Sequence, residues 1–208
     1  MVHNSPMKPR GRGRPRKFEA QSALDAALEV FRTRGYSGTS LDDLSAATGL
    51  NRPSLYGAFG NKQAMFEACV EHYWSRVGRR AMAALFATGS LERDLRAFFA
   101  VFLDVVCASE IGGCVIACAL PADVPADSAL LHRFASIFEQ SDQVVAARLL
   151  KAVDDGQLPV GAKIDRLAKV LVSLVFAISL RARAGAKRAA LEELMEESVA
   201  LVAAGGGG

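Results

Sequence analysis

The chain has 208 residues and a mass of 22.1 kDa, with 51% hydrophobic and 23% charged residues, a composition that excludes a disordered chain. Its formal charge of +3 is unevenly distributed, because residues 1–17 hold six Lys and Arg and no acid. The remainder carries 19 basic against 22 acidic residues, so the sequence predicts a basic arm directed at a polyanion and a body without that preference.

No segment predicts a membrane protein or a secreted one. The most apolar stretch, residues 167–180, includes a lysine and a serine and is shorter than the roughly 18 residues that a membrane span needs. The basic, Pro/Gly-rich start has no apolar region of a secretory signal. Four cysteines are too few for a disulfide scaffold in a chain of this length, so we expect a cytoplasmic protein with reduced thiols.

Helical periodicity begins near Phe18 and continues through the chain. Leu24, Ala27, Leu28 and Phe31 fall on one stripe of a first helix, and no segment shows the alternation of a strand. A short apolar segment that ends at Pro121 follows a glycine pair. We therefore predict an all-α fold. The predicted helices span about 18–34, 40–47, 52–59, 62–86, 91–109, 127–154, 163–184 and 187–203.

Two short helices joined by a glycine turn, over residues 40–59, predict a helix-turn-helix unit. Thr39 or Ser40 can cap the first helix, Gly49 can take the positive φ of the turn, and Asn51 can cap the second. The predicted core of this unit is apolar. It comprises Leu28, Phe31, Leu41, Leu44, Leu50, Leu55 and Phe59.

The second helix, residues 52–59, leaves small, polar and aromatic side chains to face outward. An arginine can read guanine with two hydrogen bonds, and a serine can serve a base or a phosphate. Small residues would let the helix approach the base edges closely in the major groove. The outward set is Arg52, Ser54, Tyr56, Gly57 and Ala58.

At fixed spacing, these positions resemble the N-terminal signature of the TetR family of repressors over about residues 18–70. The residues that carry the resemblance are Ala27-Leu28-Glu29-Val30-Phe31, Gly35-Tyr36, Thr39-Ser40-Leu41-Asp42-Asp43-Leu44, Gly49-Leu50-Asn51-Arg52-Pro53-Ser54-Leu55-Tyr56 and Phe59-Gly60-Asn61-Lys62. Gln63 departs from the acid that often follows the lysine.

The resemblance implies a three-helix DNA-binding head over residues 18–66 and a helical ligand-sensing and dimerisation domain over 67–204, with a disordered tail at 205–208. It makes 52–59 the recognition helix and implies that phosphates are clamped by Thr39 or Ser40, by Tyr56 and by Lys62. It implies no cofactor. The predicted DNA contacts are Arg14, Arg16, Thr39, Ser40, Arg52, Pro53, Ser54, Tyr56 and Lys62.

The arm, residues 1–17, is predicted to be flexible. Its run Arg10-Gly11-Arg12-Gly13-Arg14-Pro15-Arg16-Lys17 resembles an AT-hook, whose arginines lie in a narrow A/T minor groove. The alternative is a solvated charge run that adds only salt-dependent, non-specific affinity.

The last two predicted helices have apolar stripes that predict a homodimer interface, which a palindromic operator requires. The alternative is ordinary core within one chain, since the helix at 163–184 is apolar nearly all round. The predicted interface residues are Leu167, Val170, Leu171, Leu174, Ile178, Leu191, Leu194 and Leu201.

The helices over about 91–155 are predicted to enclose a pocket for an apolar small molecule, although each aromatic could equally fill a core. The predicted lining is Phe98, Phe102, Cys114, Cys118, Phe134 and Phe138. Cys107, Cys114 and Cys118 leave open a redox- or electrophile-sensing repressor, because Cys114 and Cys118 share a helix face. His72 and His132 lack the spacing of a metal site, and none is predicted.

The leading function is a DNA-binding regulator with an unidentified effector. An enzyme that uses Cys114 or Cys118 as its nucleophile lacks a partner His/Asp motif. An architectural DNA binder that relies on the arm alone would not need the large acidic body. The sequence does not name the operator, the regulated genes or the effector, and repression rather than activation comes from the resemblance alone.

Overall fold

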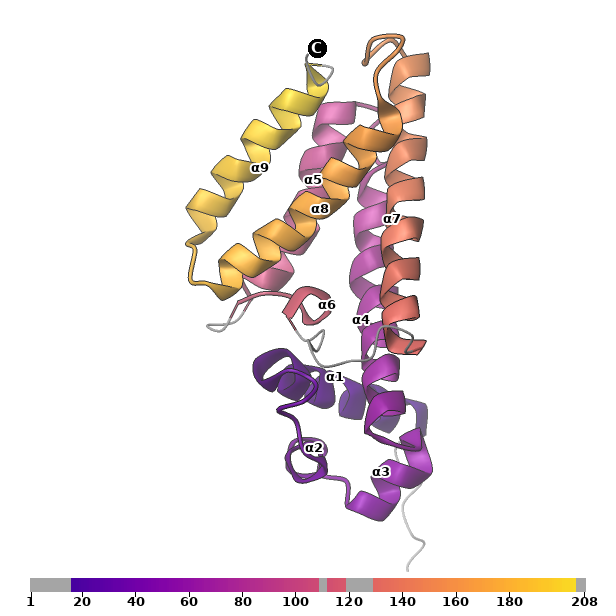
Figure 1. The fold of residues 1–208 in the computed structure, drawn as a ribbon, viewed down its shortest axis with the longest axis vertical. Coiled ribbons are helices and arrows are strands. Elements are labelled where there is room, and N and C mark those ends of the chain that lie inside the picture. The colour runs from indigo at the N-terminus through magenta and orange to yellow at the C-terminus, as the bar shows by residue number, and fades with distance from the viewer. Residues whose placement is uncertain (1–15, 109–111, 119–128, 205–208) are drawn as a thin grey trace, which may run out of the picture.

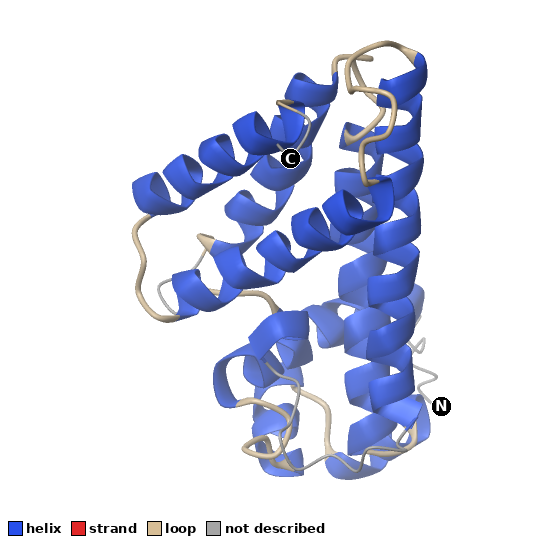
Figure 2. Cartoon of the chain, turned by 45° about the horizontal axis from the view of Figure 1, so that its top comes forward, coloured by secondary structure: helices blue, strands red, loops and turns tan. Residues whose placement is uncertain are grey.

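The computed structural model describes residues 16–108, 112–118 and 129–204, and every regular element in these ranges is an α-helix, as the sequence predicts (Figure 2). The helices are α1 (Arg16–Arg34), α2 (Leu41–Thr48), α3 (Arg52–Phe59), α4 (Lys62–Ala84), α5 (Leu91–Val106), α6 (Val115–Cys118), α7 (Ala129–Asp154), α8 (Ile164–Arg183) and α9 (Arg188–Ala203). The described residues do not include Arg14, most of the arm, Asp127 or the tail at 205–208.

The caps and the turn predicted for α2 and α3 are confirmed, whereas α1 begins at Arg16, two residues before its predicted start. The Ser40 hydroxyl accepts a hydrogen bond from the Asp43 amide while the Asp43 carboxylate accepts one from the Ser40 amide, which is a capping box. Asn51 caps α3 through the Ser54 amide, and Gly49 takes a φ of +69° in the turn. Further along, α5 ends at Val106, three residues before the predicted end at 109.

A long helix joins the head to the body. Figure 1 shows α1–α3 gathered at one end of the molecule, with α4 running from them alongside α7 into the body. The first turns of α4 bury Met65, Phe66 and Cys69 in the core that also holds Phe31 and Leu55. The predicted domain boundary at residue 66 therefore falls inside α4.

None of the helices in the described ranges is long and apolar enough to cross a membrane. The apolar stretch at 167–180 belongs to α8, which buries Ala168, Leu171, Val172, Val175 and Ile178 against the rest of the body. The predicted burial is confirmed for this face only, because Val170 and Leu180 of the same stretch are exposed.

A buried ion pair holds α5 to α7. Both Asp94 and Arg148 are almost fully buried, and the Arg148 Nη2 lies 2.9 Å from the Asp94 Oδ2. Thr88 donates to the Asp94 Oδ1 from its amide (2.9 Å) and its hydroxyl (2.7 Å), and the Arg148 Nε donates to the Leu85 carbonyl at 2.7 Å. Burial raises the pKa of Asp94, but the hydrogen bonds from Thr88 and the charge of Arg148 outweigh it, so the net pKa is lowered.

A second polar contact fastens α1 to the loop before α6 and to the end of α8. The buried Arg32 Nη1 donates to the Gly112 carbonyl at 3.0 Å. Arg183 donates to the carbonyls of Arg32 (3.4 Å) and Thr33 (3.0 Å), which are orphan groups at the end of α1. Gly112 takes a φ of +60°, and a Cβ there would lie 2.5 Å from the Ala182 carbonyl oxygen, so glycine is required.

Asp94→Asn is expected to lower the free energy of unfolding by about 3–5 kcal/mol, because it leaves the buried Arg148 charge uncompensated. The double variant Asp94→Asn/Arg148→Met should recover most of that loss, since no unpaired charge remains. Chemical denaturation of the variants measures both effects. A double variant no more stable than Asp94→Asn would contradict this account.

The buried ion pair of Asp94 and Arg148 also predicts that the stability of the fold depends on pH at acidic values. Because the folded pKa of Asp94 is below its unfolded value, its stabilisation is complete above the unfolded pKa of about 3.9 and is lost as the pH falls through the folded pKa. Below about pH 4, the unfolding free energy of the wild type should therefore fall more steeply with pH than that of the double variant.

Candidate DNA interface and ligand cavity

The outward face of α3 is exposed as predicted. Leu55 points into the core with 3% of its surface exposed, whereas its neighbour Tyr56 is 50% exposed. Arg52, Ser54, Gly57 and Ala58 are also exposed, as is Pro53 in the first turn of the helix. The helix therefore presents one continuous face of small, polar and aromatic groups, of the kind that enters a DNA groove.

Arg52 at the start of α3 is held by an acid of α2. Its Nε donates to the Asp42 Oδ1 at 3.0 Å and its Nη2 to the Asp42 Oδ2 at 2.7 Å. The hydrogen bonds that Arg52 donates to Asp42 raise the pKa of Arg52, and both side chains remain more than half exposed. In this conformation a carboxylate occupies the guanidinium fork that would read a guanine or a phosphate.

Ser40 stands exposed at the start of α2. Its amide and hydroxyl both bond the Asp43 carboxylate, and these bonds lower the pKa of Asp43. Arg34 also forms an ion pair with Asp43, which links the end of α1 to α2. Ser40 is thus placed at the surface at a helix N-terminus, where the helix dipole favours an anion, although the Asp43 carboxylate already bonds its amide and hydroxyl.

Thr39, the alternative to Ser40 in the predicted contact set, is buried. Only 2% of its surface is exposed, and its hydroxyl donates to the Gly35 carbonyl at 2.6 Å. The expectation that the Thr39 side chain reaches a phosphate is therefore corrected: its hydroxyl braces the loop between α1 and α2.

Lys62, predicted to clamp a phosphate, is engaged within the protein. Its Nζ donates to the carbonyls of Tyr36 and Thr39, each at 3.0 Å, and lies 4.4 Å from the centroid of the Tyr36 ring. These contacts tie the start of α4 to the loop before α2. Lys62 consequently fixes the position of the head helices, a role that the sequence motif does not reveal.

The arm lies almost entirely outside the described residues. Arg14 is among the residues not described, and Arg16 is the first residue of α1. Their DNA contacts stay predictions.

The predicted dimer stripe divides into buried and exposed members. Leu171, Ile178 and Leu191 have at most 1% of their surface exposed, so Ile178 and Leu191 belong to the core of one chain, which corrects the prediction for them, while Leu171 lines the groove between α8 and α9. Val170 (61%) and Leu201 (68%) are exposed. They line an open, largely apolar groove of about 590 Å³ between α8 and α9 with Leu167 and Leu174, while Leu194 is partly buried.

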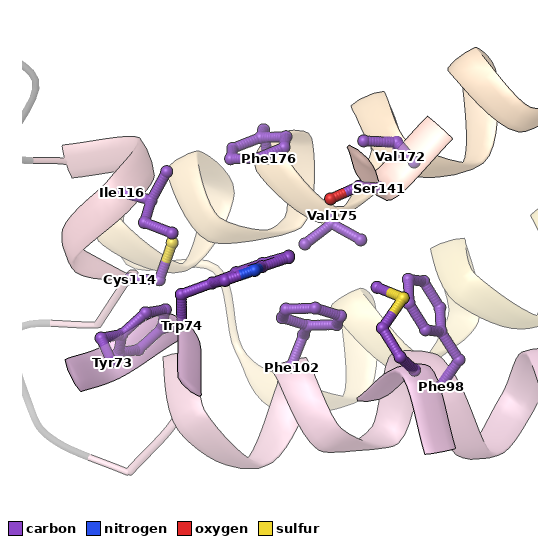
Figure 3. Close-up of a pocket in the computed structure, with 11 residues that line it drawn as sticks. Tyr73, Trp74, Phe98, Phe102, Cys114, Ile116, Ser141, Val172, Val175 and Phe176 are labelled. Carbon is purple, nitrogen blue, oxygen red and sulfur yellow. The ribbon is translucent and has the colours of Figure 1, made fainter. Parts of the chain in front are cut away.

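A small apolar cavity of about 20 Å³ lies in the body between α4, α5, α6, α7 and α8 (Figure 3). Phe98, Phe102 and Cys114 line it as predicted. Sequence reasoning missed the other lining residues, which are Tyr73, Trp74, Met82, Ile116, Ser141, Val172, Val175 and Phe176.

Three predicted lining residues are not part of the cavity wall. Phe134 stacks at 6.4 Å on Phe66, toward the head, and Phe138 packs edge-on against Phe176 behind the wall. Cys118 ends α6 with its Sγ 3.9 Å from the Ser179 hydroxyl. The physical reason is the same in each case: neighbouring helices already cover these side chains.

Two of the cysteines are poorer thiolate formers than a free cysteine. Burial raises the pKa of Cys118, and it raises the pKa of Cys69 to about 12, which disfavours the thiolate that oxidation requires. The Cys114 amide donates to the buried Ser179 hydroxyl at 2.7 Å. No cluster of three His, Cys, Asp or Glu residues able to hold a metal occurs in the described ranges, and the His72 Nε2 lies 2.8 Å from the Asp25 Oδ1.

Comparison with known proteins covers most of the chain. The family model described as "Bacterial regulatory proteins, tetR family" matches residues 23–69, and that described as "Tetracyclin repressor-like, C-terminal domain" matches residues 85–198. The HTH-type transcriptional repressor ComR of Escherichia coli is 30% identical over 189 residues, 90% of this chain and 89% of that protein. YezE of Bacillus subtilis, an uncharacterized HTH-type transcriptional regulator, is 32% identical over 70% of this chain and 76% of its own length.

A solved structure shows a similar fold bound to DNA. It is a cysteine mutant of the TetR family transcriptional regulator CifR, complexed with 26-bp double-strand operator DNA. It superposes with a TM-score of 0.79 at 26% identity and covers 93% of this chain and 98% of that chain.

Asp42→Asn is expected to strengthen DNA binding by up to about five-fold, because it frees the Arg52 guanidinium from an exposed ion pair worth at most about 1 kcal/mol. The change is measured by fluorescence anisotropy with an operator duplex that the wild-type protein selects from random DNA. Asp154→Asn, which removes the same charge from the exposed end of α7, is the matched control and should leave affinity unchanged. Unchanged or weaker binding by Asp42→Asn would show that Arg52 gains nothing from its release.

Proposed function

The chain belongs to the TetR family of bacterial regulatory proteins, and from this premise we propose that it is a homodimeric repressor that releases a palindromic operator when an apolar molecule enters its cavity. As a member of this family it is a sequence-specific, DNA-binding transcriptional regulator. The observation that supports the proposed response is the continuity of α4. This helix contributes Phe66 to the core of the head and Tyr73, Trp74 and Met82 to the cavity wall.

Operator recognition is assigned to the exposed face of α3. Arg52 and Ser54 are placed to reach base edges, and Tyr56 to reach a phosphate or a base, with Pro53 packed along the groove. Ser40 at the start of α2 supplies a second phosphate contact. Lys62 acts chiefly by holding α4 to the loop that carries Ser40.

The basic arm adds minor-groove or phosphate contacts through Arg14 and Arg16 beside the recognition helix. Releasing counterions from these phosphates makes the arm's contribution depend steeply on salt. The arm therefore contributes affinity, while α3 contributes sequence preference.

The groove between α8 and α9 is assigned to a second copy of the chain. A two-fold interface places the same patch on both subunits, so the exposed Val170 and Leu201 of each subunit can fill the groove of the other. Leu167, Leu174 and Leu194 complete this face. A dimer also gives the two heads that a palindrome requires.

The effector acts through its different affinity for two conformations. A ligand shifts an equilibrium only by its differential binding, so the released conformation must be the one with the enlarged cavity. Because α4 forms part of the cavity wall and of the head core, enlarging the cavity moves the two heads relative to each other.

Selection of bound sequences from random duplex DNA tests the DNA-reading role. The full-length protein is expected to recover a palindrome, and a variant with Arg10, Arg12 and Arg14 changed to Ala should recover the same palindrome with lower affinity. Arg52→Ala should relax the preference at particular base pairs by about 1–3 kcal/mol. Recovery of only A/T-rich DNA, lost with the arm arginines, would instead indicate an architectural binder.

Leu201→Glu is expected to abolish the dimer, because each interface would bury two unpaired carboxylates. Sedimentation of the variant should show a monomer that has lost operator binding. Val160→Glu is the matched control, since Val160 is 94% exposed in the turn between α7 and α8. A Leu201→Glu protein that stays dimeric would refute this interface.

A further inference from the structure

The cavity is nearly closed in this conformation. Its volume of about 20 Å³ leaves room for roughly one water molecule, whereas ligand sites usually measure about 300–1,000 Å³. A ligand can therefore enter only if part of the wall moves. Of the lining residues, Trp74, Met82 and Phe176 are partly exposed, and the others are buried. These three residues mark the side from which the cavity can open.

Trp74 is the wall residue best placed to turn aside. Its indole lies flat against Gly78 one turn further along α4, where a Cβ would come within 2.7–2.9 Å of three ring atoms. Figure 3 shows the ring projecting into the middle of the cavity, between Cys114, Phe102 and Val175. Phe176, by contrast, packs edge-on against Phe138 at 4.7 Å. The glycine therefore leaves the indole a space that any other residue would fill.

Tyr73 brings an unsatisfied polar group to the same wall. Only 6% of its surface is exposed, and its hydroxyl has no partner at full hydrogen-bond geometry among the described residues, although the Cys114 thiol, a weak acceptor, lies beside it. Such groups are rare, because an unpaired buried hydroxyl costs free energy that water would otherwise recover. Burial, and then the neighbouring Cys114 thiol, raise the pKa of Tyr73, so the group stays a neutral hydroxyl that can donate.

The remaining wall is uncharged. The lining residues include no Asp, Glu, Lys, Arg or His, and the Ser141 hydroxyl already donates to the Ile137 carbonyl at 2.7 Å. A charged ligand would lose its hydration here and meet no opposite charge, which is strongly unfavourable. The wall thus offers the Tyr73 hydroxyl as its buried oxygen donor, beside the indole N–H of the partly exposed Trp74, in otherwise apolar surroundings.

We propose that the cavity binds an uncharged, largely apolar molecule with one hydrogen-bond-accepting group, which displaces the Trp74 indole and is anchored by the Tyr73 hydroxyl. The inference deepens the proposed function, since it names the chemical class of the effector at the same site. Ligand binding is nevertheless measurable without DNA, so the two can be tested separately.

Three small probes of similar size test the ligand class. Cyclohexanone has an accepting carbonyl, methylenecyclohexane has the same shape with no acceptor, and cyclohexanecarboxylate is charged. Binding is followed by the fluorescence of Trp74, the only tryptophan of the chain, with free N-acetyltryptophanamide as the control for collisional quenching. The wild type should bind both neutral probes saturably, and the carboxylate at least ten-fold more weakly.

Tyr73→Phe separates the anchor from the shape of the cavity. It should weaken cyclohexanone binding by about five-fold or more and leave methylenecyclohexane binding unchanged, because only the hydroxyl is removed. Equal effects on the two neutral probes, or a carboxylate that binds as tightly as they do, would overturn the proposed class. Thermal unfolding of the variant shows whether it is folded.

The direction of the Trp74 emission shift tests the displacement. A neutral probe that pushes the indole toward solvent should shift the emission to the red and increase its quenching by acrylamide. Gly78→Ala should produce the same red shift without a probe, since its Cβ takes the place of the ring. A blue shift on probe binding would mean that the ligand covers the indole and would overturn the displacement.

Operator release is then measured with the same probes. Binding with the expected Tyr73 dependence and no effect on DNA affinity would uphold the ligand class and refute the effector role of the cavity. Operator release by cyclohexanone that is unaltered in Tyr73→Phe would uphold the effector role and overturn the proposed anchor.

Discussion

The packing around Phe66 is the interaction on which the arrangement of head and body depends. The ring centroid of Phe66, on α4, lies 4.8 Å from that of Phe31 on α1, 5.2 Å from that of Tyr36 and 6.4 Å from that of Phe134 on α7. One fully buried side chain thereby joins three parts of the molecule. Close-packed aromatic contacts of this kind shift between discrete arrangements rather than deform continuously. The packing therefore couples the head to α4 and, through Phe134, to α7 of the body.

Most of the fold was predictable from the sequence because local signals and packing agree. Ser40, Gly49 and Asn51 occupy the positions that capping and turn geometry demand, and they delimit α2 and α3 correctly. Leu55 and Tyr56 also face opposite ways, as helical spacing requires. Where a backbone position requires one residue type, the sequence alone is enough to predict where a helix begins and ends.

The sites were less predictable, because periodicity does not say which neighbour covers a buried face. Phe98 and Phe134 are both buried phenylalanines, yet only Phe98 reaches the cavity. Leu171 and Val170 are adjacent on an all-round apolar helix, yet Leu171 is fully buried and Val170 is 61% exposed. These distinctions arise from the packing angles of α8 against α7 and α9, which the sequence of one helix does not encode.

The polar residues of the motif show a further limit of sequence reasoning. Thr39 and Lys62 match the family signature, but their contacts are with the Gly35, Tyr36 and Thr39 carbonyls of the loop before α2. A motif records that a residue type is needed at a position without saying which partner needs it. Here the need is to satisfy backbone carbonyls and so to fix the loop.

The bonds from Arg183 to the end of α1 have a consequence for the architecture of the operator. Arg183 is the last residue of α8, a helix of the proposed dimer interface, and it holds the carbonyls of Arg32 and Thr33 in the head. In the proposed dimer, these bonds would link each head to the helix pair that lies at the two-fold axis. One additional base pair between half-sites rotates one of them by about 35° around the duplex. Such a dimer would therefore discriminate between operators by the distance between their half-sites as well as by their sequence.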